Sequence, residues 1–307
     1  MKKETAIFLF RIIPLAVRKA LASGISRLVY YLSSKHRLIA IHNLMRSFPE
    51  KSLREVCRIA KGSYESFAIM IVEFTEILLM KRENLHHWIS IIGLEHYTAA
   101  CREGKGVLLF SAHFGNWEIG NAALALLTRP LVFMVRLLDN PFMEEVTTYL
   151  RAACGNISLH KENAMRKTLQ LLRKGEIINI LVDQNVAWYE GIFVDFFGRP
   201  ACTTFGVAQL ALHTGAAVMP AFTRRLPSGK YLLEIGPKTD IIDTGNRDAD
   251  IFINTQKITK IIEEYVRKYP EQWLWLHQRW KTKPWQAKRI KKNVAEKKSK
   301  DAQRRHN

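Results

Sequence analysis

The sequence predicts an α/β protein with a mostly parallel central sheet flanked by helices, preceded by an N-terminal helical segment that associates with a membrane. From residue 106 onward, short apolar runs alternate with helical stretches, which is typical of strands joined by crossover helices. Between residues 41 and 90, apolar residues recur with a spacing near 3.6, which indicates helices. The first 40 residues are apolar but interrupted by basic residues, as in helices that lie in a membrane surface.

Within this first segment, Arg11, Arg18, Lys19 and Arg27 interrupt the apolar runs. No uncharged stretch approaches the roughly 20 residues of a simple membrane span, and a secretory signal needs an unbroken apolar core. Arg11, Arg18 and Lys19 share one mixed face of a helix that Pro14 is expected to kink. We therefore expect an interfacial helix with its basic residues towards the lipid headgroups; docking on the protein's own core is the alternative.

The alternating region contains five expected strands and five expected helices. The strands are expected at residues 106–112, 131–136, 176–183, 217–225 and 230–236. The helices are expected at residues 117–128, 141–153, 162–174, 205–214 and 249–269. Active residues of such sheets gather where the parallel strands end, so the strand ends are the places to search for a site.

The formal net charge of +19 is concentrated at the two ends of the chain. Residues 281–307 hold eleven Lys or Arg against two acidic residues, and residues 1–40 hold eight against one. Such ends favour an anionic surface, either acidic lipid or nucleic acid. We therefore divide the chain into a membrane-associated helix at 1–40, an α/β domain at 41–287 and a basic, disordered tail at 288–307.

The four cysteines form no CxxC pair and no metal-ligand spacing. A disulfide framework and a zinc site are therefore not expected, and a reducing compartment is the default.

The stretch "LLFSAHFGNWEIG" carries the clearest chemical signal. His113 falls in the turn after an expected buried strand, and Glu118 falls in the first turn of the following helix, which Asn116 is suited to cap. A carboxylate one turn away can hold an imidazole in one tautomer and make it a better base. GxSxG is absent, so a His–Glu pair without its own nucleophile suggests that the substrate supplies the attacking hydroxyl. A structural histidine is the alternative.

"HFGNWE" resembles the HX4(D/E) motif of the glycerolipid acyltransferase superfamily, in the form found in bacterial late acyltransferases of lipid A biosynthesis. Five further stretches resemble this family in the expected order: "HNLMRSFPEKS", "FMVRLLDNP", "LVDQN", "FVDFFGRPACTTFGVAQLALHTGAAVMPAF" and "YPEQWLWLHQRWK". The resemblance covers about residues 7–285.

The resemblance implies an acyltransferase on the cytoplasmic face of the bacterial inner membrane. It implies transfer of a fatty acyl chain from acyl carrier protein to a hydroxyl of a lipid A precursor, with no metal or organic cofactor. Its partners would be acyl carrier protein, the lipid acceptor and the anionic membrane, with no nucleic acid. The aromatic and basic segment "WLWLHQRWK" then belongs to the membrane interface or the core.

For the site, the resemblance makes His113 the general base and Glu118 the carboxylate that orients it. Arg136 would end a strand at the same edge, where a guanidinium can clamp a phosphate or the oxyanion, or form only a surface salt bridge. Asp183 and Gln184 would orient Arg136, bind substrate or cap their strand.

Three further residues are substrate-binding candidates. Gly115 would bring the backbone close to the reacting carbonyl, so that neighbouring N–H groups form an oxyanion hole, and Asn116 lies beside it. Arg199, in "FFGRP", departs from the small or apolar residue usual in the family and adds a phosphate contact or nothing.

Two other functions remain open on the sequence. One is acyl transfer, with acyl-CoA as an alternative donor, to another amphiphile such as a phosphatidylinositol mannoside, an ornithine-type lipid or a lysophospholipid. The other is a membrane-binding or nucleic-acid-binding protein without activity. An intact His113 and Glu118 favour an enzyme.

Overall fold

The computed structural model describes residues 2–160 and 164–286, so the predicted tail at 288–307 lies outside the described residues. The central sheet has seven strands in the order β1-β9-β8-β2-β5-β3-β4, and a separate hairpin is formed by β6 and β7. Within the sheet, β8 and β9 pair antiparallel and the other neighbours pair parallel. The strands are β1 (Ile89–Ile92), β2 (Val107–Ser111), β3 (Val132–Val135), β4 (Ile157–His160), β5 (Ile177–Leu181), β6 (Gly191–Phe196), β7 (Arg199–Thr204), β8 (Ala217–Arg225) and β9 (Tyr231–Ile235). The predicted α/β fold with a mostly parallel sheet is confirmed.

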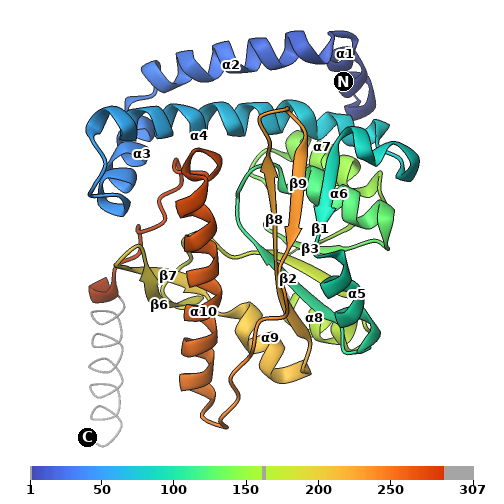
Figure 1. The fold of residues 1–307 in the computed structure, drawn as a ribbon, viewed down its shortest axis with the longest axis vertical. Helices are drawn as coiled ribbons and strands as arrows, with labels where there is room; N and C mark the ends of the chain where they lie inside the picture. The colour runs from blue at the N-terminus through green and yellow to red at the C-terminus, as the bar shows by residue number, and fades with distance from the viewer. Residues whose placement is uncertain (1, 161–163, 287–307) are drawn as a thin grey trace, which may run out of the picture.

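Helices cover both faces of this sheet (Figure 1). One apolar core packs beneath α8 (Ala164–Arg173), α9 (Gly206–Thr214) and α10 (Arg247–Lys268). A second core packs beneath α5 (Leu94–Arg102), α6 (Trp117–Leu127) and α7 (Pro141–Ala152). Side chains of β2 alternate between the two cores, and all five of its residues are buried, because a parallel strand covered on both faces has no solvent side.

All five strands and five helices predicted from residue 106 onward are present, with ends shifted by at most a few residues. The edge strands β1 and β4 and the β6–β7 hairpin were not predicted. Each of the two edge strands has four residues, of which one is buried. Such a short, half-exposed strand carries too little apolar periodicity to be recognised.

The N-terminal segment forms three helices and not one. Pro14 separates α1 (Lys3–Ile12) from α2 (Leu15–Leu32), and α3 (Ser34–Ser47) follows directly. Figure 1 shows α2 lying along the long helix α4 (Leu53–Phe74). Short 3₁₀ turns, η1 (Thr75–Leu79) and η2 (Arg82–His87), connect α4 to the sheet, and a third, η3 (Pro270–Gln272), follows α10.

The side of α2 that meets α4 is partly polar, whereas its outer side is apolar. The buried residues of α2 are Arg18, Ala22, Ser26 and Tyr30, one turn apart along a single stripe. The exposed apolar residues of α1, α2 and their junction are Phe8, Leu9, Phe10, Ile12, Ile13, Val17, Leu21, Ile25, Leu28, Val29, Tyr31 and Leu32. This outer apolar face reverses the pattern of an ordinary surface helix. None of the described helices has both the length and the apolar character required to cross a membrane.

Three basic residues of this segment, Arg11, Arg18 and Lys19, do not point outward as expected. Arg18 is buried with 4% of its side chain exposed, and its Nη1 lies 2.9 Å from Glu76 Oε1. Arg11 lies 3.6 Å from the same carboxylate, and Lys19 Nζ lies 2.5 Å from Glu73 Oε1. The expectation that these three cations face headgroups is wrong, because two buried carboxylates draw them inward.

Candidate active site

The register of two central strands brings His113 and Asp183 together. In the parallel pair β2 and β5, Ser111 lies opposite Leu181. Two residues beyond that position, the segment after β2 reaches His113 and the segment after β5 reaches Asp183. Both side chains therefore meet at the carboxyl edge of the sheet, where open α/β folds place their sites.

Asp183 holds the imidazole through two contacts. Its Oδ1 lies 2.8 Å from His113 Nδ1, and its Oδ2 accepts a hydrogen bond of 2.9 Å from the backbone N–H of His113. Burial alone would raise the pKa of Asp183, but the adjacent imidazole and these hydrogen bonds lower it to about 2. The ionised carboxylate accepts a hydrogen bond from the Nδ1–H group of the neutral imidazole, so the lone pair of the ring lies on Nε2.

Gln184 lies on the other side of the imidazole. Its Nε2 is 3.2 Å from His113 Nε2, so its amide donates to the lone pair of the neutral imidazole. The side chain of His113 remains 21% exposed. Asp183 and Gln184 therefore flank His113; neither contacts Arg136 among the described residues.

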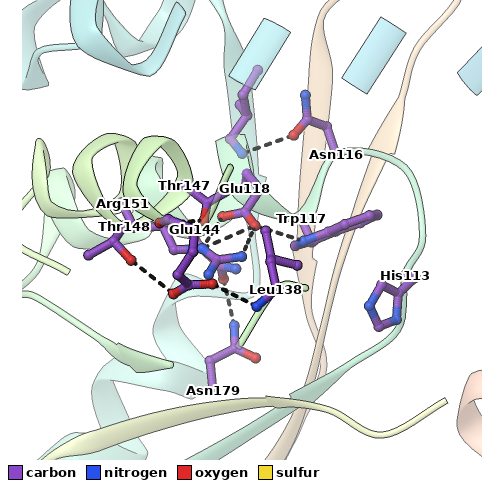
Figure 2. Close-up of polar contacts among 12 residues, drawn as sticks. His113, Asn116, Trp117, Glu118, Leu138, Glu144, Thr147, Thr148, Arg151 and Asn179 are labelled. Atoms are coloured by element: carbon purple, nitrogen blue, oxygen red, sulfur yellow. Dashed lines mark hydrogen bonds and ion pairs between the residues drawn. The ribbon is translucent and has the colours of Figure 1, made fainter. Parts of the chain in front are cut away.

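Glu118 does not make the expected contact with the His113 imidazole: Asp183 occupies that place, and the Glu118 carboxylate is engaged elsewhere. Arg151 of α7 donates three hydrogen bonds to Glu118, the shortest of 2.6 Å from Nη2 to Oε1. Trp117 donates from its indole N–H to the same oxygen over 3.1 Å. Figure 2 shows Glu118 joined to Arg151 and Trp117, with His113 apart from them. Because Trp117 contacts the His113 ring edge to face at 5.0 Å, Glu118 reaches the imidazole only through Trp117.

We predict that Glu118 acts together with Arg151. Glu118→Gln and Arg151→Gln should each lower the free energy of unfolding by about 3 kcal/mol, because each leaves a mostly buried charge unpaired. Each should also reduce turnover by displacing Trp117. The double variant should lose no more turnover than the worse single variant, as measured in a double-mutant cycle. Full turnover in Arg151→Gln beside a large loss in Glu118→Gln would restore a direct role for Glu118.

Gly115 and Asn116 both have roles in the fold. Gly115 has φ of 56°, and a Cβ there would lie 1.9 Å from the carbonyl oxygen of Thr223 in β8, so only glycine fits. Its N–H donates to Gln272 O over 2.8 Å. Asn116 is fully buried and caps α6 by accepting a hydrogen bond of 3.1 Å from Ile119 N. The N-cap prediction is confirmed. The Gly115 N–H and the Asn116 side chain are engaged within the fold, and an oxyanion hole at the neighbouring N–H groups stays a prediction.

The two predicted arginines lie in different surroundings. Arg136 follows β3, has 76% of its side chain exposed and pairs with the exposed Asp139 at 2.9 Å. This is the surface salt bridge that was the alternative interpretation. Arg199 begins β7 and is half-buried, with its guanidinium carbon 3.5 Å from the ring centroid of Trp280.

The closing aromatic segment supplies site residues that sequence reasoning missed. Trp273 donates its indole N–H to Asp183 Oδ2 over 2.7 Å, and Leu274 N donates to His113 O. Arg279 is fully buried and donates to the carbonyl oxygens of Gln184 and Cys202. The pattern "WLWLHQRWK" marks this segment in the sequence, but the pattern does not indicate which of its indoles contacts Asp183.

His277 belongs to this segment and predicts a pH effect on stability. Burial lowers the pKa of His277 from 6.5 to about 4; Asp183 opposes this, while His113 and nearby cations add to it. Since the unfolded chain binds this proton more tightly, stability should be full above pH 6.5 and fall, by at most about 3 kcal/mol, as the pH drops to 4. Urea unfolding should show a flatter pH dependence for His277→Gln. Parallel curves for the two proteins would contradict the assignment.

Comparison with known proteins places this site in a family. Residues 5–282 match the family described as bacterial lipid A biosynthesis acyltransferase. The lipid A biosynthesis lauroyltransferase of Escherichia coli (strain K12) is 27% identical over 279 residues, which cover 89% of this chain and 88% of that protein. The lipid A biosynthesis palmitoleoyltransferase of the same strain is 27% identical over 274 residues, covering 89% and 87%.

A relative with another acceptor in its name is also similar. The phosphatidylinositol mannoside acyltransferase of Mycobacterium tuberculosis (strain CDC 1551 / Oshkosh) is 26% identical over 228 residues, covering 71% of this chain and 69% of that protein. The family match extends over almost all of the chain, including the strand ends that carry His113 and Asp183. The chain therefore belongs to the bacterial lipid A biosynthesis acyltransferases, and it is an enzyme that transfers acyl groups.

Proposed function

We propose that the enzyme transfers a fatty acyl chain from acyl carrier protein to a hydroxyl of a lipid A precursor, with His113 as the general base and Asp183 as its orienting carboxylate. The observation that carries this proposal is the contact of 2.8 Å between His113 Nδ1 and Asp183 Oδ1, which leaves a basic Nε2 at the sheet edge. The names of the similar lipid A acyltransferases support the acceptor. The acyl carrier protein rests on the family resemblance.

The reaction needs no covalent enzyme intermediate. The acceptor hydroxyl replaces the Gln184 amide at His113 Nε2, and its proton passes to Nε2 as its oxygen attacks the thioester carbonyl. Asp183 stabilises the imidazolium that forms. The tetrahedral intermediate then collapses, the carbon–sulfur bond breaks and the thiolate takes the proton from Nε2. The ester product and the free thiol leave His113 in its starting state.

Two cysteine thiols are poorly suited to act as nucleophiles in this reaction. Cys154 and Cys202 are buried, and burial raises the pKa of each thiol to about 11. A thiol with so high a pKa holds little thiolate at neutral pH. Direct attack by the acceptor hydroxyl agrees with this arrangement.

We further propose that the enzyme works on the cytoplasmic face of the bacterial inner membrane, with α1 and α2 lying in the leaflet surface. Twelve apolar side chains are exposed along these helices and their junction. An exposed apolar surface of this extent favours a lipid or protein partner. Arg11, Arg18 and Lys19 turn inward, and Arg27 is an exposed cation among the apolar side chains of α2, so apolar insertion dominates over attraction by charge.

Replacing Leu21, Ile25 and Leu28 together with Gln should abolish most membrane binding without unfolding the protein. These side chains are 53%, 59% and 57% exposed, and burying each one in lipid is worth about 1.5–3 kcal/mol. Cosedimentation with phosphatidylethanolamine and phosphatidylglycerol vesicles should fall by about a hundredfold or more.

The matched control is Phe252→Gln with Ile253→Gln in the first turns of α10, whose N-terminal end lies far from α2 in Figure 1. Their side chains are 47% and 37% exposed, and the control should bind vesicles like the wild type. Equal losses in both variants would contradict a membrane face on α2.

The reaction is tested by incubating purified enzyme with acyl carrier protein or coenzyme A thioesters and a panel of acceptors. We expect the highest kcat/KM for acyl carrier protein with a lipid A precursor, and none in the His113→Ala variant. The similarity to a phosphatidylinositol mannoside acyltransferase favours a mannoside as the second acceptor to test. Preference for that lipid, or for a lysophospholipid, would replace the proposed acceptor.

A further inference from the structure

A cavity of about 600 Å³ lies where α3, the start of β7 and the segment 278–284 meet. We call it the α3 cavity. Its lining includes His42, Arg46, Arg199, Lys281 and Lys283, together with Trp280, and no Asp or Glu among the described residues lines it. Four cations and a histidine around one hollow constitute a strong positive field.

Carboxylates do not compensate these cations in the described part of the chain. Arg46, Arg199, Lys281 and Lys283 make no ion pair there. Burial, and next the charge of Arg46, lowers the pKa of Arg199 to about 10. Burial and the charges of Arg46, Arg199 and Lys283 also lower the pKa of His42. The fold therefore holds like charges together, which an anion would relieve.

Arg199 is fixed in one orientation over this hollow. Its guanidinium stacks on Trp280, and Nη2 donates to Ser47 Oγ over 3.0 Å and to Asn43 O over 3.4 Å. Its Nε is buried and has no hydrogen-bond partner among the described residues. A guanidinium held by stacking and two hydrogen bonds is preorganised for a planar, charge-assisted contact with phosphate.

One segment of the chain connects the cavity with the active site. Asn43 lines the cavity and donates from its amide to the carbonyl oxygen of His277 over 3.2 Å. Three residues earlier in the same segment, Leu274 N donates to His113 O. The segment that follows α10 therefore joins the two sites.

Exposed apolar side chains occur both in the cavity lining and at the end of α2, which directly precedes α3. Leu38, in its lining, is 61% exposed, and Leu32 at the end of α2 is 74% exposed. Exposed apolar side chains beside a group of cations suit an amphiphile with an anionic headgroup. This placement favours the acceptor over the thioester donor.

Building on the proposed function, we propose that the α3 cavity binds a phosphate group on the headgroup of the lipid acceptor, and that Arg46 and Arg199 contact this phosphate. Removing one charge-assisted hydrogen bond costs about 1.5–3 kcal/mol of binding free energy, which corresponds to roughly a tenfold to hundredfold rise in the dissociation constant. Because the cavity recognises phosphate, a phosphorylated acceptor should be preferred over the same lipid without phosphate.

The test compares Arg46→Gln and Arg199→Gln with Lys35→Gln, which removes an exposed charge from α3 outside the cavity. Each enzyme is assayed on a lipid A precursor in phosphorylated and phosphatase-treated forms. The two arginine variants should raise KM for the phosphorylated form by about tenfold to a hundredfold. Their kcat, their KM for the dephosphorylated form and their KM for the acyl donor should stay close to wild type, as should all parameters of Lys35→Gln.

A binding measurement on the same proteins does not require turnover. Micelles of the phosphorylated precursor should bind wild type and Lys35→Gln more tightly than the two arginine variants, in a fluorescence titration. Equal affinities would overturn the cavity assignment, and so would a rise in KM confined to the acyl donor or loss of vesicle binding alone. Absence of acyl transfer to both precursor forms by wild type, with phosphate-dependent binding intact, would instead refute the proposed function.

Discussion

Replacing Asp183 with Asn is expected to reduce kcat by about 10²–10⁴-fold while the protein remains folded. All three donors at Asp183 point to carboxylate oxygens: His113 Nδ1, the His113 backbone N–H and the Trp273 indole. Asn offers one oxygen and one NH₂ group. An NH₂ facing Nδ1 would force the proton onto Nε2, where the acceptor hydroxyl requires a lone pair.

The measurement is the pH profile of kcat/KM for Asp183→Asn beside wild type and Asp195→Asn. Asp195 is an exposed carboxylate of β6 that caps the turn at Gly198 and has no contact with His113. The control should retain wild-type turnover, and circular dichroism should show all three proteins folded. Near wild-type turnover in folded Asp183→Asn would exclude Asp183 as the orienting carboxylate.

Loss of stability in the same variant must be separated from loss of turnover. Removing a charged acceptor of hydrogen bonds costs about 1.5–3 kcal/mol, and the fully buried Arg279 also loses a nearby negative charge. Assays well below the melting temperature isolate the chemical effect. A fall in kcat without a comparable rise in KM would place the loss in the transition state.

The two strands that precede His113 and Asp183 could be located in the sequence because both strands are buried on both faces of the sheet. Runs such as "GVLLFSA" and "EIINILVD" have the length and composition of covered parallel strands, and both are present as β2 and β5. The position of His113 after the first of them was therefore predictable. So was the position of Asp183 after the second.

The pairing of these two residues was not predictable, because it depends on which strands are neighbours. β2 and β5 are separated by β3, β4 and their helices in the chain but are adjacent in the sheet, with Ser111 opposite Leu181. Sequence proximity instead favoured Glu118, five residues from His113. The partner of Glu118, Arg151, lies 33 residues away, and a single sequence contains no signal for that contact.

The same reason explains the error at the N-terminal helices. The periodicity of Arg11, Arg18 and Lys19 identified a common face of the helix, but it did not identify whether that face is turned towards the protein or towards the membrane. Glu73 and Glu76, at the end of α4 and the start of η1, decide it by offering buried carboxylates. Removal of the residues before about residue 35 would consequently uncover these carboxylates. A loss of activity in such a truncated protein would therefore reflect unfolding as well as lost membrane contact.

Arg18→Gln should therefore destabilise the protein by about 3–5 kcal/mol, as expected when one partner of a buried ion pair is removed. Arg18 and Glu76 each have 4% of their side chains exposed, and Arg18 also donates to Thr75 Oγ1 and to Ile13 O. The variant leaves Glu76 with the Thr75 hydroxyl at 3.3 Å and, as a cation, the more distant Arg11 at 3.6 Å. Chemical unfolding should show the loss at all salt concentrations, because buried pairs are little screened.

The matched control is Arg27→Gln, which removes the same charge from the same helix. Arg27 has 70% of its side chain exposed and lies 3.9 Å from Glu65, so its loss should change stability by less than about 1 kcal/mol. Replacing Arg18 and Glu76 together with Met should recover most of the stability, because both fully buried charges are then removed and Arg11, which loses Glu76, is 22% exposed. If Arg18→Gln unfolded like wild type and lost vesicle binding only at low salt, Arg18 would face the headgroups, and the inward orientation of the basic residues would be refuted.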